Sequence, residues 1–440
     1  MADYRKYMIR PLQHGQDLSI PSINQPFENA TWGALNFKVE QRSIKKRRGY
    51  VLHRNLGPSV EVQNIIWMIY SGGTAATIVL TDTDAIKLET ATGKTWSYIN
   101  EEHTTGTAQT NADPSAQIDG SVAGTVTDWV DATDDSAPAV GDWLILDADY
   151  TADEEPNTDW RQILTVDSDS QITLTGTYGQ VQVAKAAYTI IKKYTVPDSE
   201  RWTWCQVLDK LYFTNGAVNV QVWTGAGHAT TLDSTDATKA RYCIEYADRL
   251  VLADLFIAGS RQLYTVKWSA NGDPTDWTSS DAGSNDLTDT DDFITGMGKV
   301  GENLIIYKQD SIVIANKTGD PDDPIHFPRQ RKGIGTPAPY SIVHAHDTNF
   351  FVGRRDFYMI NGDRPESIGG NVRSKFFDIV NPTEVKRVFG YHHELENEVR
   401  WITTDKDGNR WCFCFDYIYG EWTVNQYADL IGCAGKGASL

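Results

Sequence analysis

One sequence pattern occurs twice in this chain, at residues 303–314 and again 46 residues later at 349–360. The first copy begins Asn303-Leu304-Ile305-Ile306-Tyr307-Lys308-Gln309-Asp310 and the second begins Asn349-Phe350-Phe351-Val352-Gly353-Arg354-Arg355-Asp356. An Asn, an apolar triplet, a basic residue, an Asp and a second apolar run recur in register without a gap. Repeats of about 40–50 residues built from short strands are typical of propellers. The pattern therefore predicts repeated β-sheets.

Similar apolar runs precede and follow these two copies. Their first apolar residues are Leu211, Leu250, Leu304, Phe350 and Val399, at spacings of 39, 54, 46 and 49 residues. Each run follows a polar turn pair and is interpreted as the inner strand of a blade. An earlier stretch, residues 64–80, fits the same pattern. We predict an all-β fold, a β-propeller of six or seven blades; the alternative is an irregular all-β protein in which two hairpins are similar by chance.

The composition suits a large β-rich core. The chain has 440 residues, of which 40% are hydrophobic and 11% aromatic, and aromatic side chains favour pleated, half-buried surfaces. No helix longer than two or three turns is expected. No run of 18 apolar residues occurs, so no membrane span is predicted. The first residues lack the apolar stretch of a secretory signal, which predicts synthesis in a cytoplasm.

Five cysteines are present, at positions 205, 243, 412, 414 and 433. None belongs to a Cys-x-x-Cys motif, and Cys412 and Cys414 alternate within a strand pattern, which places both on one face. We interpret them as small buried apolar residues rather than metal ligands or a disulfide framework.

The negative charge is concentrated in one segment. The formal net charge is −19, and residues 104–192 hold 15 Asp and Glu against 3 Lys and Arg, a difference of −12. Residues 140–146 and 163–174 within it alternate as strands do. We therefore predict an inserted acidic β-barrel or sandwich at 104–192, with an N-terminal arm at 1–30, the start of the propeller at 31–103 and its remainder at 193–440. The alternative is a disordered acidic loop.

Three basic clusters stand out in this acidic chain: Lys45, Lys46, Arg47 and Arg48; residues 329–332; and the pair Arg354 and Arg355. Nucleic-acid binding is one interpretation. The acidic balance of the whole chain argues against it, since neutralising phosphates drives affinity for DNA. The other interpretations are a solvated face and a patch that docks onto an acidic protein partner. The first cluster and the Arg pair are our candidate partner-docking residues.

Several motifs could bind a metal ion, but we prefer to interpret each of them as a turn or as ordinary core or surface residues. The Asp-rich turns at 82–84, 289–292 and 405–409 lack the spacing of an EF-hand loop. His344, His346, His392 and His393 could ligate a metal, but no third ligand is evident near either pair. We therefore predict no metal site, no cofactor and no catalytic residues.

Propellers also include glycoside hydrolases, which place two carboxylates across a sugar. The turn at residues 269–277 superficially resembles the Asp-box turns of sialidases, but its Asp and Gly are transposed. No cluster of well-spaced Arg residues to hold a sialic carboxylate is evident. We therefore expect the chain not to be an enzyme, with a glycosidase kept as the less favoured alternative.

The chain resembles the tail nozzle proteins of short-tailed bacteriophages, also called tail accessory or stabilisation proteins. The resemblance rests on the basic-Arg-Gly-aromatic stretch at 43–50 and on blade motifs at 247–253, 264–277 and 294–304. It covers roughly residues 30–100 and 195–425, and the insertion lies outside it. The resemblance implies a propeller subunit, six copies of which ring the DNA channel below the portal and its adaptor, retaining and releasing the genome without chemistry.

From this we expect a structural protein of the virion tail, made in the bacterial cytoplasm. Its expected partners are further copies of itself in a hexameric ring, the portal and adaptor proteins, and other tail proteins. DNA would pass without specific binding, since acidic walls repel phosphate. The runner-up is a carbohydrate-binding or host-recognition tail propeller, with exposed Trp and Tyr stacking on sugars.

Overall fold

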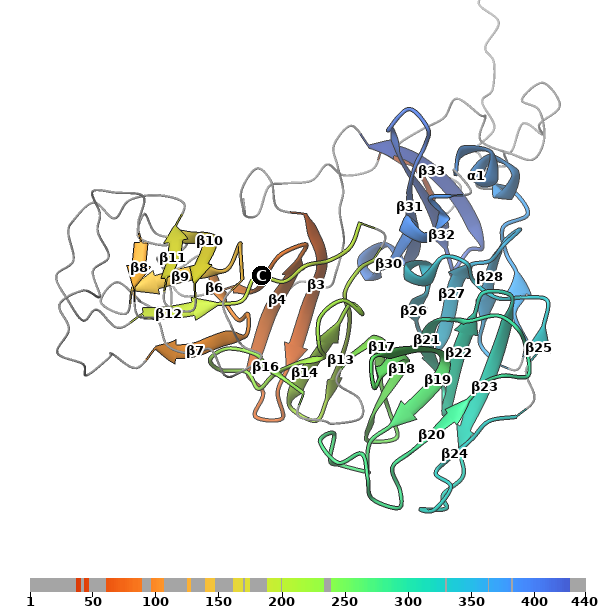
Figure 1. The fold of residues 1–440 in the computed structure, drawn as a ribbon. Coiled ribbons are helices and arrows are strands. Elements are labelled where there is room, and N and C mark those ends of the chain that lie inside the picture. The colour runs from red at the N-terminus through yellow and green to blue at the C-terminus, as the bar shows by residue number, and fades with distance from the viewer. Residues whose placement is uncertain are drawn as a thin grey trace, which may run out of the picture. The chain divides into compact units, whose positions relative to one another are not determined.

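The fold is known from a computed structural model of the chain. It describes residues 37–40, 43–46, 61–88, 96–106, 125–127, 139–146, 161–168, 171–174, 188–198, 200–232, 239–328, 331–362, 364–380 and 383–427. Within this part the fold is all-β, with six blades of the β-propeller class (Figure 1). Each blade is an antiparallel sheet whose strands follow one another in sequence order. The predicted fold class is confirmed, and the described residues form six blades.

The chain divides into two compact units that are not contiguous in sequence. Unit 1 comprises Met1–Asn55, Asp198–Arg201 and Ala240–Lys436, and unit 2 comprises Leu56–Pro197, Trp202–Lys239 and Gly437–Leu440. Unit 2 contains two blades and the inserted sheet, and unit 1 contains four blades. The short segment 198–201 therefore belongs to unit 1, although the chain on both sides of it belongs to unit 2.

Unit 2 holds the first two blades. Blade 1 is formed by β3 (Val62–Ile69), β4 (Ala75–Thr81), β5 (Ala85–Leu88) and β6 (Trp96–Tyr98). Blade 2 is formed by β13 (Thr203–Val207), β14 (Lys210–Thr214), β15 (Gln221–Trp223) and β16 (Thr230–Thr231). A shared core joins their facing sides, in which the rings of Trp202, Phe213 and Tyr194 meet edge to face.

A further sheet is inserted between these two blades. Its strands are β7 (Glu102–Gly106), β8 (Thr125–Thr127), β9 (Trp143–Leu146), β10 (Arg161–Ser168), β11 (Gln171–Leu174) and β12 (Tyr188–Ile191). They pair in the order β7-β12-β9-β10-β11-β8. The strands expected within 140–146 and 163–174 correspond to β9, β10 and β11. The apolar alternation in the acidic segment therefore does form strands.

Unit 1 holds the other four blades. Blade 3 is β17 (Lys239–Tyr246), β18 (Arg249–Ile257), β19 (Ser260–Trp268) and β20 (Gly283–Asp286); blade 4 is β21 (Ile294–Val300), β22 (Asn303–Lys308), β23 (Ser311–Lys317) and β24 (Ile325–His326), with β25 (Arg331–Lys332) also paired to β23. Blade 5 is β26 (Val343–Ala345), β27 (Thr348–Val352), β28 (Phe357–Ile360) and β29 (Glu366–Ser367); blade 6 is β30 (Phe389–His393), β31 (Glu398–Thr404), β32 (Arg410–Asp416) and β33 (Glu421–Tyr427).

The remaining elements are short. A hairpin of β1 (Phe37–Glu40) and β2 (Ser43–Lys46) precedes blade 1, and β1 contacts β33. The one α-helix of the described chain, α1 (Arg373–Ile379), and the 3₁₀ turns η2 (Pro339–Ser341), η3 (Val385–Arg387) and η4 (Glu394–Glu396) lie between or within the last blades. None of the helices described here has the length and apolar character needed to cross a membrane.

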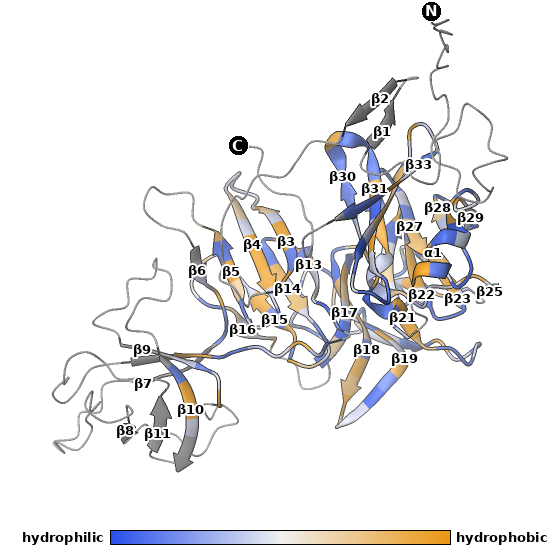
Figure 2. Ribbon diagram, turned by 90° about the horizontal axis from the view of Figure 1, so that it is seen from above, coloured by the Kyte–Doolittle hydropathy of each residue, from blue (hydrophilic) through white to orange (hydrophobic). Residues whose placement is uncertain are grey.

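The repeated apolar triplets occupy a different strand from the one predicted. They lie in β14, β18, β22, β27 and β31, which are the second strands of their blades rather than the inner, first strands. A second strand has a neighbour on each side and sheets packed on both faces, so it is buried on both faces. Continuous apolar runs are the expected sequence of such a strand. Figure 2 shows apolar residues, in orange, along β18.

The largest core of unit 1 lies in blades 5 and 6 and beneath α1. Phe357 stacks at an angle on Trp401 and Trp422, with ring centroids 4.9 and 4.7 Å away, and α1 adds Phe376 at 4.6 Å. Cys412 and Cys414 are fully buried in the neighbouring cluster, with their Sγ atoms 3.5 Å apart. Their placement on one strand face agrees with the prediction, and the described Cys205 and Cys243 are buried as well.

Candidate functional site

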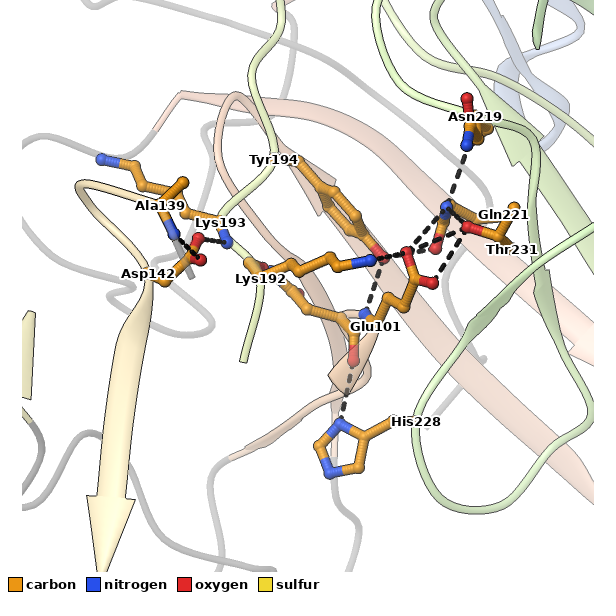
Figure 3. Close-up of polar contacts among 11 residues, drawn as sticks. Glu101, Ala139, Asp142, Lys192, Lys193, Tyr194, Asn219, Gln221, His228 and Thr231 are labelled. Carbon is orange, nitrogen blue, oxygen red and sulfur yellow. Dashed lines mark hydrogen bonds and ion pairs between the residues drawn. The ribbon is translucent and has the colours of Figure 1, made fainter. Parts of the chain in front are cut away.

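A cluster of polar side chains lies where the inserted sheet joins blades 1 and 2. Glu101 directly precedes β7, and Lys192 directly follows β12, so the two mark the entry and exit of the inserted sheet. Gln221 and Thr231 come from β15 and β16 of blade 2. Together with Tyr194 these residues are called the base cluster below (Figure 3).

The Glu101 carboxylate is the centre of the base cluster. Both of its oxygens accept from the Thr231 hydroxyl at 3.0 Å, and Oε2 pairs with Lys192 Nζ at 3.0 Å. The Tyr194 hydroxyl donates to Gln221 Oε1 at 2.9 Å and accepts the Glu101 backbone N–H at 2.9 Å. Burial raises the pKa of the Tyr194 phenol well above its usual value, so it stays a neutral donor.

Blade 1 is tied to the same point through Asn100, which is fully buried. Its Oδ1 accepts from the Ala85 backbone N–H at 2.7 Å, and its Nδ2 donates to Asp84 Oδ1 at 3.0 Å and to the Lys192 carbonyl at 2.7 Å. The Asn100 carbonyl lies 2.9 Å from His228 Nδ1 of blade 2. The side-chain amide of Asn100 thus links blade 1 to the exit of the inserted sheet, and its main-chain carbonyl contacts blade 2.

A further contact reaches into the inserted sheet itself. Asp142, which is buried and stands just before β9, accepts the backbone N–H of Lys193 through Oδ1 and that of Ala139 through Oδ2, each at 2.8 Å. Hydrogen bonds to charged groups are the strong ones, at about 1.5–3 kcal/mol each. The groups of this site bond to one another, which is the arrangement of a structural joint.

A second ionic network is buried in unit 1. Asp254 on β18 is fully buried and accepts from Arg261 Nε at 2.6 Å, and Arg241 Nε lies 3.6 Å from its Oδ2. Arg241 also pairs with Glu200 at 2.8 Å, and Glu200 accepts the hydroxyl of Tyr340 at 2.9 Å. That hydroxyl in turn accepts the Arg201 backbone N–H at 2.8 Å. These contacts hold the segment 198–201 to unit 1.

The predicted docking residues are dispersed. Lys45 and Lys46 lie on β2, where they pair with Lys38 and Phe37, and Arg47 and Arg48 lie outside the described residues. Arg354 and Arg355 are exposed in the turn between β27 and β28. Arg354 is not free, because its Nη2 donates to Asp310 Oδ2 of blade 4 at 2.8 Å. Docking through these residues stays a prediction.

The Asp-rich turns are held by groups of the chain itself. Lys308 Nζ, fully buried, donates to the Leu287 carbonyl at 2.8 Å and to Thr290 Oγ1 at 2.6 Å, and it lies 3.3 Å from Asp292 Oδ1. An ammonium thus stands inside the loop that has the acidic composition of a calcium turn. Burial lowers the pKa of Lys308, and the charge of Asp292 opposes that shift.

The turn at 405–409 is closed in a similar way. Asp405 Oδ1 accepts the backbone N–H groups of Asp407 and Asn409 at 2.9 and 2.8 Å, and Oδ2 accepts Trp411 Nε1 at 2.9 Å. Burial raises the pKa of Asp405, but these hydrogen bonds outweigh it and the pKa is lowered overall. Within the described ranges no three His, Cys, Asp or Glu side chains are placed to hold a metal ion.

The structure brings together histidines that the sequence leaves apart. His346 follows β26 of blade 5 and His392 lies on β30 of blade 6, and their ring centroids are 5.7 Å apart. His392 Nε2 lies 3.1 Å from the Tyr417 hydroxyl, and His344 Nδ1 lies 3.0 Å from Asn349 Oδ1. Burial lowers the pKa of His392, and the neighbouring His346 adds to the shift. The sequence signal is that both pairs lie on or directly after the corresponding first strands of adjacent repeats, β26 and β30.

No protein family and no curated protein matches the chain. Among solved structures it is similar to the extracellular domain of a protein assigned to a hybrid two component system of B. thetaiotaomicron (10% identity, TM-score 0.30), covering 84% of this chain and 39% of that one. It is also similar to AztD from Citrobacter koseri (10%, TM-score 0.32; 84% and 82% covered) and to a protein assigned as a 6-phosphogluconolactonase from Bacteroides fragilis (12%, TM-score 0.33; 66% and 82%). Likeness at this level transfers no activity.

Proposed function

We propose that the chain is a structural protein of a bacteriophage tail, a propeller subunit that forms a ring in the nozzle below the portal and adaptor. The proposal starts from the resemblance of residues 43–50, 247–253, 264–277 and 294–304 to nozzle proteins. The six-bladed fold supports it, because that resemblance implies a propeller. In this role the ring retains the packaged genome and conducts it during ejection.

The observation that carries the proposal is that buried and half-buried polar side chains bond to other groups of the chain and so join its parts together. Glu101, Asp254 and Lys308 are each the centre of a network, and in each network the partners are other groups of the same chain. Such networks fix loops and junctions relative to the sheets. A scaffold that holds an inserted module on blades 1 and 2 needs this kind of joint.

Native mass spectrometry tests the proposal. The purified chain is measured alone and then mixed with the portal–adaptor complex of the phage from which it comes. A defined ring, or several copies added to that complex, is the expected result. A chain that stays monomeric and does not join the complex would contradict the proposal.

A carbohydrate-binding tail propeller is the second candidate. The observation that favours it is the exposure of two aromatic side chains, Trp204 on β13 and Tyr419 after β32. Aromatic faces of this kind stack on sugar rings. A glycan array that shows binding by the wild-type chain, and loss of that binding in Trp204→Ala or Tyr419→Ala, would select this candidate. A blank array would dismiss it.

A further inference from the structure

Three exposed large apolar side chains of blade 6 lie in the turns at one end of its sheet. These are Leu395, 93% exposed, together with Ile418 at 61% and Tyr419 at 47%. Leu395 stands in the turn between β30 and β31, and Ile418 and Tyr419 stand in the turn between β32 and β33. We call these three residues the turn patch.

Strand register shows that the turn patch is continuous. β31 pairs with β32 so that Glu398 faces Asp416, the residues that border the two turns. The turns are also bonded to each other, because the Tyr417 backbone N–H donates to the Asn397 carbonyl at 3.2 Å. Leu395 and Ile418 therefore project from adjoining turns at the same end of one sheet.

The patch continues toward blade 5 through aromatic rings. His346, in the turn between β26 and β27, has its ring centroid 5.4 Å from that of Tyr417. Phe350 lies 6.2 Å from Tyr417 on the inner side. The rings of His346, Phe350 and Tyr417 thus pack together next to the turn patch, and this packing fixes the turn that carries Ile418 and Tyr419.

Unit 2 shows the same feature at the corresponding end of its own blades. Ile69 ends β3 and Leu208 follows β13, and they are 55% and 56% exposed. Gln206 Nε2 donates to the carbonyls of both, at 2.8 and 3.1 Å, so these two residues are neighbours. In each unit, then, the end reached by the first strand of a blade carries exposed apolar side chains.

The same end is acidic in unit 1. Each of the four blades places at least one exposed carboxylate in these turns: Asp248 in blade 3, Glu302 and Asp320 in blade 4, Asp347 in blade 5 and Glu394 in blade 6. The opposite end has a mixed charge, with Arg354, Arg355 and Lys406 beside Asp310 and Asp407. Carboxylates outnumber cations in the turns of the acidic end, although Lys317, which pairs with Glu302 at 2.6 Å, and Arg364 are exposed there too. An excess of one sign of charge favours partners of the opposite sign.

We propose that the turn patch is a docking surface for another protein, whose surface offers an apolar pocket bordered by Lys and Arg side chains. Exposed apolar groups ringed by charge mark protein interaction sites, and a few such residues carry most of the binding energy. The acidic turns supply the complementary charge to a basic rim. The inference deepens the proposed function, because the partner is a component of the portal–adaptor complex.

The test compares binding of full-length variants to the isolated portal–adaptor complex by biolayer interferometry. Leu395→Asp combined with Ile418→Asp is expected to weaken binding at least tenfold, and Leu395→Ser alone to weaken it less. The matched control is Leu164→Asp, an exposed leucine of the inserted sheet, which should bind like wild type. Circular dichroism checks that each variant is folded.

The outcomes separate the two proposals. If wild type does not bind the complex, the proposed function fails and the docking surface falls with it. If wild type binds and the double variant binds equally well, only the docking surface is wrong. A double variant that alters self-association but still joins the complex would show that the turn patch is a contact between copies of the chain, which also overturns the docking proposal.

The salt dependence of binding tests the basic rim of the partner. Wild-type binding should weaken as NaCl rises from about 0.05 to 0.5 M, because salt screens charge pairing. Binding that is insensitive to salt would refute the basic rim.

Discussion

Arg354 of the second repeat donates to Asp310 of the first, at 2.8 Å, and so joins blade 5 to blade 4. Arg354 is the counterpart of Lys308, 46 residues earlier, and Asp310 is the counterpart of Asp356. The counterparts behave differently. Lys308 is buried and bonds to Leu287 and Thr290, in the loop before β21. Asp356 is buried and accepts from the Ser367 hydroxyl at 2.6 Å and from Arg373 at 3.3 Å.

The Arg354–Asp310 pair should contribute little to stability. Its side chains are 57% and 50% exposed, and exposed ion pairs contribute about 0–1 kcal/mol. Arg354→Ala is therefore expected to lower the free energy of unfolding by less than about 1 kcal/mol. Denaturant unfolding of Arg354→Ala, Asp310→Ala and the double variant measures the coupling between them; a coupling well above that range would contradict the assignment.

Replacing Lys308 should have a large effect. Lys308→Met removes the donor to the Leu287 carbonyl and Thr290 Oγ1 and leaves Asp292 without its cation. Removing one partner of a buried ion pair costs about 3–5 kcal/mol. The measurement is the shift in thermal midpoint by calorimetry, with the exposed Lys406→Met as the control. Equal midpoints for the two variants would show that the buried ammonium is dispensable.

The base cluster should control how firmly the inserted sheet is held. Glu101→Ala leaves Thr231 and Lys192 without their acceptor, at a cost of about 1–3 kcal/mol. Since about 1.4 kcal/mol is a factor of ten, amide hydrogen exchange in β12 should rise roughly fivefold or more. Glu366→Ala, on an exposed edge strand, is the control. Unchanged exchange in β12 would show that Glu101 does not fasten the sheet.

Asp276 gives a pH-dependent test. Hydrogen bonds from Ser279 and Thr278 hold its pKa at about 2, below the ordinary value of 3.8. Because the folded-state pKa is the lower one, the contribution to stability is complete above pH 3.8 and is lost as the pH falls toward 2. Asp276→Asn should lose less stability than wild type over that interval. A carboxyl titration by NMR checks the pKa directly, and an ordinary value would refute the assignment.

The fold was predictable from sequence because its signal is local and repeated. A second strand that is buried on both faces favours an apolar run, and a hairpin requires a polar turn. Apolar runs that follow polar turns therefore recur along the chain, beginning at residues 211, 250, 304, 350 and 399. The same reasoning misplaced these runs as inner strands. Inner and second strands differ in their neighbours, and a single sequence does not show those.

The base cluster could not be predicted, because its contacts join distant positions. Glu101 meets Thr231 across 130 residues and Gln221 meets Tyr194 across 27. No spacing rule singles out these side chains among the chain's 59 Asp and Glu. The contact between His346 and His392 could not be predicted either. It arises because blades 5 and 6 pack side by side, and the local sequence around each histidine does not show that packing.

The segment 198–201 has a consequence for synthesis on the ribosome. Glu200 is made 140 residues before Tyr340, the residue whose hydroxyl it accepts. At about 5–20 residues per second, that interval is on the order of ten seconds. During this time the segment has emerged between two stretches of unit 2, and its contacts with unit 1 are still incomplete, because Arg241 is made early in the interval but Tyr340 only at its end. Nascent chains stalled before and after residue 340 should therefore differ in protease cleavage at 198–201, with protection only in the longer one.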